Sequence, residues 1–414
     1  MKAIKVILSA SFLVFSFAVV AQIHVHDGSW RGVFTLSNGQ EAPFNFELKD
    51  NNVYLLNGEE RFELKNVAIK GDSLFIPIDI YDAALAAKIE DHKSLSGTLR
   101  KNNAAPTDAV IPFKAVEGKT YRFFETPPAA NVSVHGKWDF VIGTTNGGNK
   151  TVGVFEQKGS KLTGTILSTT GDYRYFEGSV KGDEFYLSAF SGSNPSLIKG
   201  KVNGNELVGE LINFRGAQPI KGTRNEKAAL PDAYTLTTIK EGTTFDFTFP
   251  DAFTGKKVSL KDSKYQGKAV IVTILGSWCP NCIDEAAFLA PWYEANKNKG
   301  VEIIGLSFER KNDPEFAKTR LEVLKNKFNI GYDILFAGLA DKKFTASVLP
   351  ALSDVVSFPT TIFIDKNGKV TKIHTGYSGP ATGVYYQEFV KEFNQIVDEL
   401  LNPSSLKANS QGGK

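Results

Sequence analysis

The sequence predicts a multidomain protein with a β-rich N-terminal half, built as a barrel or a sandwich from two related blocks, and a C-terminal α/β domain. Short alternating apolar runs, separated by Asn-Gly, Asp-Asn and Gly-Asp turns, fill residues 22–224. From about residue 245, strand and helix patterns alternate, which predicts a mainly parallel sheet covered by helices. The only two cysteines, Cys279 and Cys282, lie where one of these strands meets a helix.

The first 21 residues have the pattern of a secretory signal peptide. Lys2 and Lys5 precede an apolar core, and small residues end at Ala21, before Gln22. The core of ~15 residues is shorter than the ~20 that a membrane-spanning helix needs. We therefore expect secretion across the inner membrane into the periplasm, with a membrane tether through an uncleaved leader as the alternative.

The charge balance gives no indication of a nucleic acid or an anionic membrane as partner. Lys and Arg total 48 against 45 Asp and Glu, a net charge of +3 that includes Lys2 and Lys5 of the leader. Hydrophobic residues make up 42% and charged residues 22%, which is typical of a folded soluble protein and excludes an intrinsically disordered one.

Two β-rich blocks occupy residues 22–126 and 132–224, and their sequences resemble each other. Three short motifs recur at nearly constant spacing: Gly28-Ser29-Trp30 as Gly136-Lys137-Trp138, Lys70-Gly71-Asp72 as Lys181-Gly182-Asp183, and Gly97-Thr98-Leu99 as Gly209-Glu210-Leu211. This recurrence predicts an internal duplication, or two related sheets that form one larger barrel or sandwich.

The β-rich blocks carry no clear catalytic motif. Trp30 and Trp138 are expected to anchor the cores and not to form ligand platforms. Ala and Leu cluster at residues 83–89, which predicts one helical interruption. His24 and His26 have no third ligand nearby in the sequence, so no metal site is expected there.

The second half divides into a polar linker (225–244), an α/β domain (245–402) and a disordered tail (403–414). Pro280 in the first turn of a helix, and Asp313 as the N-cap before Pro314, are helix start signals. The expected strands are 258–260, 269–275, 301–308, 360–364 and 369–374, and the expected helices are 280–296, one from Asp313-Pro314, 341–349 and 387–401. Asp365-Lys366-Asn367-Gly368 predicts the hairpin turn between the last two strands.

The Cys-x-x-Cys spacing at a strand-to-helix junction is typical of a redox-active pair. A helix N-terminus lowers a thiol pKa from ~8.5 to about 3.5–7.5, so Cys279 is expected to be the more exposed, attacking residue. Cys282, one turn later, is expected to be buried and to resolve the mixed disulfide. A zinc site is disfavoured because the chain has no second Cys pair, and a structural disulfide because so short a loop would stabilise little.

The segment from Phe245 to Leu401 resembles the TlpA/ResA-type members of the thioredoxin family. The matching blocks are Gly255 to Leu260, Gly267 to Val270, Ser277 to Cys282 with Glu285, Phe358 to Thr361, and Ile364 to Lys369. The resemblance implies a thioredoxin fold with a strand–helix insertion at residues 310–350. It also implies extracytoplasmic thiol–disulfide oxidoreductase activity, usually reductive.

The resemblance also implies residue roles. Cys279 and Cys282 are the redox pair, and Pro359 matches the cis-proline that packs beside the disulfide and helps to present the substrate backbone. Glu285 matches an acidic residue three positions after the second cysteine, which on a helix lies beside Cys282 and would shuttle its proton. A solvated surface Glu is the alternative. Thr273 stands where thioredoxin itself has a buried Asp, which favours Glu285 for this role.

Trp278, Pro280 and Phe358 are expected to line the substrate groove. Phe358 is bulkier than usual for the family before the cis-proline and is expected to alter substrate access. The dipeptide Pro280-Asn281 is not the commonest one, and dipeptide identity tunes the reduction potential, so both directions of electron flow stay open. Gly276 disfavours a peroxiredoxin, in which Thr would stand three residues before the reactive Cys.

Together these features predict an enzyme that reduces protein disulfides through a mixed disulfide with Cys279. The expected partners are a protein thiol or disulfide substrate and an upstream thiol electron donor, with a membrane-bound donor as one option. No cofactor is expected beyond the Cys279–Cys282 redox-active disulfide, and no metal. The alternative is a binding or scaffold protein whose β-rich half recruits a ligand or partner, with the thioredoxin-like domain accessory.

Overall fold

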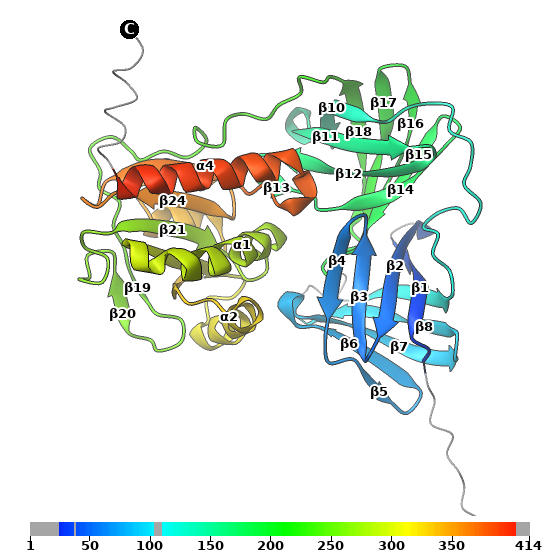
Figure 1. The fold of residues 1–414 in the computed structure, drawn as a ribbon, viewed down its shortest axis with the longest axis horizontal. Helices are drawn as coiled ribbons and strands as arrows, with labels where there is room; N and C mark the ends of the chain where they lie inside the picture. The colour runs from blue at the N-terminus through cyan, green and yellow to red at the C-terminus, as the bar shows by residue number, and fades with distance from the viewer. Residues whose placement is uncertain (1–24, 37–38, 103–109, 403–414) are drawn as a thin grey trace, which may run out of the picture.

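The computed structural model describes residues 25–36, 39–102 and 110–402 (Figure 1). The predicted signal peptide (1–21) and C-terminal tail (403–414) lie outside the described residues. The described chain forms an open β-sheet unit, a β-barrel unit and an α/β domain. None of its helices in these ranges is both long and apolar enough to cross a bilayer.

The first β unit is an antiparallel sheet of nine strands in the order β4-β3-β2-β1-β9-β8-β7-β6-β5. Its edge strands β4 and β5 are not paired with each other, so within the described residues the sheet remains open as a half-barrel. The strands are β1 (Gly28–Thr35), β2 (Glu41–Lys49), β3 (Asn52–Asn57), β4 (Glu60–Leu64), β5 (Ala68–Lys70), β6 (Ser73–Ile78), β7 (Ala83–Asp91), β8 (Ser94–Lys101) and β9 (Val110–Glu117).

The helix predicted at residues 83–89 is wrong, because this segment is strand β7. Its residues alternate between buried and partly exposed, and they pair with β6 on one side and β8 on the other. The Ala-rich composition favours a helix only weakly, and the ladders and apolar contacts of a central strand outweigh that preference. The short turn η2 (Asp79–Tyr81) just before β7 is the helical element of this region.

The second β unit repeats this chain path and closes into a barrel. Its strand order is β11-β10-β18-β17-β16-β15-β14-β12-β13, and an added pairing of β11 with β12 completes the ring of eight strands. The strands are β10 (Gly136–Ile142), β11 (Asn149–Lys158), β12 (Lys161–Ser168), β13 (Gly171–Asp172), β14 (Phe176–Lys181), β15 (Glu184–Ala189), β16 (Ser196–Asn203), β17 (Glu206–Asn213) and β18 (Gly216–Arg224).

The recurring sequence motifs fall on corresponding strands of the two units. Trp30 on β1 and Trp138 on β10 are 1% and 0% exposed, as expected of core anchors. Each indole N–H donates to the carbonyl four residues earlier, that of His26 over 3.1 Å and that of Val134 over 2.9 Å. The two units therefore share a strand path and a local hydrogen bond, and their origin by internal duplication stays a prediction.

The α/β domain has a five-stranded sheet in the order β23-β22-β21-β24-β25. Strands β21, β22 and β23 are parallel, and β24 and β25 are antiparallel to their neighbours. Its elements are β19 (Thr248–Pro250), β20 (Lys257–Ser259), β21 (Ala269–Leu275), α1 (Pro280–Asn296), β22 (Val301–Glu309), α2 (Pro314–Phe328), β23 (Asp333–Leu339), α3 (Lys342–Val348), β24 (Thr360–Ile364), β25 (Val370–Thr375) and α4 (Val384–Leu401).

Both faces of this sheet are covered, which explains why β21 and β22 are buried along their whole length. Ile271 packs in the core shared with α1, α2 and α4, while its neighbour Val272 packs in the core on the α3 side. The predicted insertion at 310–350 contains α2, β23 and α3, and it supplies the edge strand of the sheet. The domain is thus a thioredoxin fold with an insertion.

The predicted linker, 225–244, packs against the α/β domain. Lys240 N–H donates to the Ala351 carbonyl over 2.8 Å, and Ser353 N–H donates to the Thr238 carbonyl over 2.8 Å. These backbone bonds tie the chain between the barrel and the α/β domain to the loop that precedes β24.

Candidate active site

Cys279 lies at the N-terminus of α1, directly after the buried strand β21. Its backbone is extended, Pro280 occupies the first helical position, and the Cys279 N–H donates to the Gly276 carbonyl over 3.1 Å. Its Sγ atom lies 3.4 Å from the Phe358 carbonyl oxygen, to which the thiol donates. Both cysteines are free thiols, 7% exposed at Cys279 and 1% at Cys282.

The two thiols have opposite electrostatic environments. A hydrogen bond from Cys282 lowers the pKa of Cys279, and the backbone N–H groups of Asn281 and Cys282 lower it further, while burial opposes them. Burial raises the pKa of Cys282, and the bond to Cys279 adds to this rise. Cys279 is therefore the thiol that ionises first, which fits a nucleophile at a helix N-terminus.

The loop before β24 lies beside the cysteines. The Phe358–Pro359 peptide bond is cis, as the family resemblance implies. The Phe358 ring packs edge-on against Trp278, with centroids 5.7 Å apart, and the Trp278 indole donates to the Phe308 carbonyl over 3.0 Å. Trp278, Pro280 and Phe358, the predicted groove residues, are partly exposed around the buried thiol.

Glu285 is buried, with 2% of its surface exposed. The Thr273 hydroxyl donates to Oε2 over 2.5 Å, and the Thr361 hydroxyl donates to Oε1 over 2.6 Å. Burial raises the pKa of Glu285 to about 7, although these two hydrogen bonds act to lower it. The alternative of a solvated surface Glu is wrong, because β21, α1 and β24 enclose this side chain.

Comparisons with known proteins support the assignment for the C-terminal third. Residues 240–387 match the redoxin family. The thiol-disulfide oxidoreductase ResA of Bacillus thuringiensis subsp. konkukian is 30% identical over 138 residues, 33% of this chain and 69% of the relative. Its Bacillus subtilis counterpart is 33% identical over 122 residues, 30% of this chain and 60% of the relative.

Through its C-terminal domain, the chain belongs to the ResA-type thiol-disulfide oxidoreductases.

Solved structures of similar proteins also align with this domain. A DsbF homologue from Corynebacterium diphtheriae has 19% identity and a TM-score of 0.30, covering 42% of this chain and 98% of its own. The thioredoxin domain of a thiol-disulfide oxidoreductase from Bacteroides vulgatus has 25% identity and a TM-score of 0.28, covering 37% of this chain and 99% of its own.

Glu309 is a site residue that the sequence analysis missed. It lies at the end of β22, is 1% exposed, and accepts bonds from Ser277 N–H (3.0 Å), Ser277 Oγ (2.7 Å) and Ser307 Oγ (2.6 Å). These bonds fix the turn just before Cys279. A sequence pattern that could have indicated this residue is its position directly after the apolar run that ends at Phe308. A carboxylate buried at such a position needs hydrogen-bond partners.

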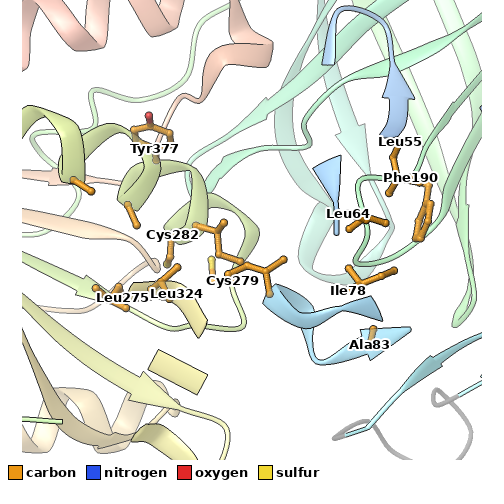
Figure 2. Close-up of a cluster of buried hydrophobic side chains, with 14 of the residues drawn as sticks. Leu55, Leu64, Ile78, Ala83, Phe190, Leu275, Cys279, Cys282, Leu324 and Tyr377 are labelled. Carbon is orange, nitrogen blue, oxygen red and sulfur yellow. The ribbon is translucent and has the colours of Figure 1, made fainter. Parts of the chain in front are cut away.

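The two β units cover the cysteine face of this ResA-type domain, which the sequence analysis did not predict. Figure 2 shows Cys279 beside the turn that leads to Ala83, where the cores of the α/β domain and the first unit meet. Residues from both sides belong to one hydrophobic cluster, which also includes Phe190 of the barrel. This covering explains why Cys279 is less exposed than expected.

Arg174 of the barrel joins all three units. Its guanidinium donates to Glu60 of β4 over 2.5 Å, to Asp284 of α1 over 3.0 Å and to the Tyr81 hydroxyl over 3.3 Å. The Arg174 side chain is 12% exposed, so these are largely buried interactions. Burial raises the pKa of Asp284 to about 7, while Arg174 acts to lower it.

The turn between β12 and β13 covers the groove beside Pro359. The Thr170 carbonyl accepts bonds from the Ser357 hydroxyl (3.0 Å) and from the Asn281 side chain (3.4 Å). Asp172, which follows this turn, accepts a bond of 2.7 Å from the Gly379 N–H. A segment of the barrel thus occupies the surface on which the Cys-Pro-Asn-Cys motif and the cis-proline loop meet.

Proposed function

We propose that this protein reduces disulfides in protein substrates outside the cytoplasm, with Cys279 as the attacking thiolate and Cys282 as the resolving thiol. The observation that carries the proposal is the position of Cys279 at the N-terminus of α1, in contact with the cis-proline loop, with Cys282 buried one turn later. In this arrangement hydrogen-bond donors lower the pKa of Cys279, and burial raises the pKa of Cys282. A pair with one ionised and one protonated thiol is ready for the first step of exchange.

The exchange has two steps. The Cys279 thiolate attacks one sulfur of the substrate disulfide, a mixed disulfide forms, and the other substrate sulfur leaves as a thiolate that takes up a proton. Cys282 then loses its proton and attacks the Cys279 sulfur, which releases the second substrate thiol and forms the Cys279–Cys282 disulfide. Two electrons pass from the cysteine pair to the substrate, and an upstream thiol donor restores the pair.

Glu285 is proposed as the group that takes the proton from Cys282 in the second step. Its carboxylate affects the pKa of Cys282 through its charge, and its own pKa of about 7 suits proton transfer near neutral pH. Pro359 is proposed to help position the substrate backbone next to Cys279 when the turn at Thr170 leaves the groove that it covers. Trp278, Pro280 and Phe358 are proposed to border the path of the substrate.

The extracytoplasmic location rests on the leader-like sequence of residues 1–21. Sequencing the mature N-terminus would distinguish a cleaved leader from a membrane tether. The direction of electron flow is decided by the reduction potential of the Cys279–Cys282 couple, for which thioredoxin (about −270 mV) and DsbA (about −120 mV) are the reference limits. A reductase requires a value near that of thioredoxin.

Insulin reduction tests the proposal directly. Cys279→Ser is expected to abolish reduction of insulin disulfides and to leave the circular dichroism spectrum unchanged. Cys282→Ser is expected to accumulate a mixed disulfide with the substrate, because the resolving thiol is missing. Unchanged insulin reduction by the folded Cys279→Ser protein would contradict the proposal.

The β units are proposed to act at the redox site and not as a separate binding scaffold. The support for this is their contact with the cysteine face through Arg174, Tyr81 and Thr170. Tight binding of a defined ligand or protein by residues 22–224, on a surface away from these contacts, would favour the scaffold alternative instead.

A further inference from the structure

A cleft lies at the junction of the three units, directly beside the redox-active motif. It has a volume of about 400 Å³, within the range of small-ligand and peptide sites. Trp278 and Pro280, the chain neighbours of Cys279, both line it. The first unit contributes Tyr81, Asp82, Ala83 and Lys101, the barrel contributes Ser193, Asn194, Phe214 and Arg215, and the α/β domain also contributes Ser277, Glu309, Arg310, Phe316 and Arg320.

The lining of this three-unit cleft has more positive than negative groups. Its four basic side chains are Lys101, Arg215, Arg310 and Arg320, and its two acidic ones are Asp82 and Glu309. Glu309 is buried and its carboxylate accepts three bonds from Ser277 and Ser307. Asp82 lies 3.9 Å from the Arg320 guanidinium. The cleft therefore has a net positive charge.

Arg310 is a basic group of the cleft that contacts Trp278, the residue before Cys279. Its guanidinium lies over the Trp278 ring, 5.4 Å from the centroid, and the side chain as a whole is exposed. In the part of the chain that the structure describes, no carboxylate oxygen lies within ion-pair distance of Arg310. A guanidinium stacked on an aromatic ring presents its N–H edge for a carboxylate to bind in two-point fashion.

One approach to Cys279, between the Cys motif and the cis-proline loop, is covered. The turn at Thr170 is bonded to Asn281 and Ser357, so it occupies the groove between the Cys motif and the cis-proline loop. For a substrate that leaves the three units in place, the cleft lined by Trp278 and Pro280 is an opening directly beside the motif.

From this geometry we propose that the three-unit cleft binds acidic peptide disulfides, with carboxylate side chains beside the cystine held by Arg310 and the neighbouring basic groups. The inference rests on the proposed disulfide reduction and adds a substrate class to it. The size of the cleft limits the bound part to a short peptide segment, and its aromatic walls, Trp278 and Phe214, contact the apolar parts of that segment.

Two cystine-linked peptides that differ only in Glu or Gln beside the cysteines provide the test. The wild-type protein is expected to reduce the Glu peptide with a kcat/KM about tenfold higher, as a charge-assisted bond to Arg predicts. Arg310→Gln is expected to reduce this ratio severalfold. Arg61→Gln, which changes an exposed arginine paired with Glu47 outside the cleft, is the matched control and should keep the ratio.

Equal kcat/KM values for the two peptides, or an unchanged ratio in Arg310→Gln, would overturn the inference. Hydroxyethyl disulfide, which is small and uncharged, separates this failure from that of the proposed function. If the wild-type protein reduces hydroxyethyl disulfide and shows no preference between the peptides, only the substrate class is wrong. If it reduces none of the three disulfides, the proposed function itself is wrong.

Discussion

The Thr361 hydroxyl donates a hydrogen bond of 2.6 Å to Oε1 of Glu285, and this bond links the strand after the cis-proline to the helix of the redox motif. The hydroxyl of Thr273, on β21, donates a hydrogen bond to the other carboxylate oxygen, Oε2. The carboxyl group is thereby fixed between three elements, one helical turn from Cys282.

Stability should depend on pH through Glu285. Its pKa rises from 4.5 to about 7 on folding because it is buried, so the folded state holds its proton more tightly than the unfolded state. Stability from this group is therefore fully present below pH ~4.5 and is lost as the pH rises through ~7. Glu285→Gln has no carboxyl group to titrate at this position, so its free energy of unfolding should not fall with pH in this way. The variant's free energy of unfolding relative to the wild type should therefore increase by about 2–3 kcal/mol from pH 5 to pH 8. Urea unfolding at both pH values measures the gain, and Glu322→Gln on the exposed face of α2 should show none.

Proton transfer should depend on the same carboxylate. Glu285→Gln is expected to slow the attack of Cys282 on the mixed disulfide at least tenfold at pH 7, because a positioned base typically contributes 10²–10⁴-fold. It should also lower the pKa of Cys282, since the Glu285 charge raises it. Stopped-flow measurement of substrate release and thiol titration give both quantities. A variant with unchanged resolution rate and unchanged titration of both cysteines would rule out the role.

Arg174→Gln should expose Cys279. The substitution leaves Glu60 and Asp284 without the guanidinium that joins them, and breaking a buried ion pair costs about 3–5 kcal/mol. This cost weakens the contact between the units, so the units should separate more often and expose Cys279. In proteins that carry Cys282→Ser, so that only Cys279 can react, iodoacetamide should alkylate Cys279 at least tenfold faster with Arg174→Gln than without it. Arg61→Gln is the control, as its ion pair with Glu47 is exposed. An unchanged alkylation rate in a folded Arg174→Gln protein would show that this arginine does not hold the units together.

Glu309→Ala should destabilise the protein by about 1–3 kcal/mol, because the buried Ser277 N–H then lacks an acceptor. Glu309→Gln retains one carbonyl oxygen as an acceptor, so it should be the milder change. Urea unfolding at pH 7 measures both. If Ala and Gln variants are equally stable, the bonds to Ser277 do not fix the turn before Cys279.

Trp138→Ala should destabilise the barrel by about 3–5 kcal/mol, since the indole is fully buried. Trp138→Phe keeps most of the apolar surface and loses mainly the 2.9 Å bond to the Val134 carbonyl, so its cost should be smaller. Thermal unfolding followed by circular dichroism tests this order. A similar cost for both variants would mean that the hydrogen bond, and not the packing, dominates.

The features that could be predicted from the sequence are those that a short stretch of chain determines. The pattern around Cys279 located the redox motif, and Asp313 with Pro314 located the start of α2, where the Asp313 side chain caps two backbone N–H groups. The turn Asp365 to Gly368 likewise connects β24 and β25, with Gly368 in the left-handed region. Each of these features depends on residues close together in the chain.

The remaining features depend on residues that are far apart in the chain. Arg174 and Asp284 are 110 positions apart, and neither has a local pattern that indicates its partner. The burial of Cys279 likewise depends on residues far away in the chain, such as Thr170, which is 111 positions from its partner Asn281. The strand at 83–89 was missed because its identity is set by its neighbours β6 and β8.

The repeated strand path has an evolutionary consequence for the cleft. The connection β6–β7 of the first unit contributes Tyr81 and Asp82, and the corresponding connection β15–β16 of the barrel contributes Ser193 and Asn194. The same ends of two copies therefore face each other across one opening. If the two units arose by the predicted duplication, an ancestor with a single copy would have had half of this wall, and relatives that lack either copy should retain the cysteine motif without the proposed selectivity.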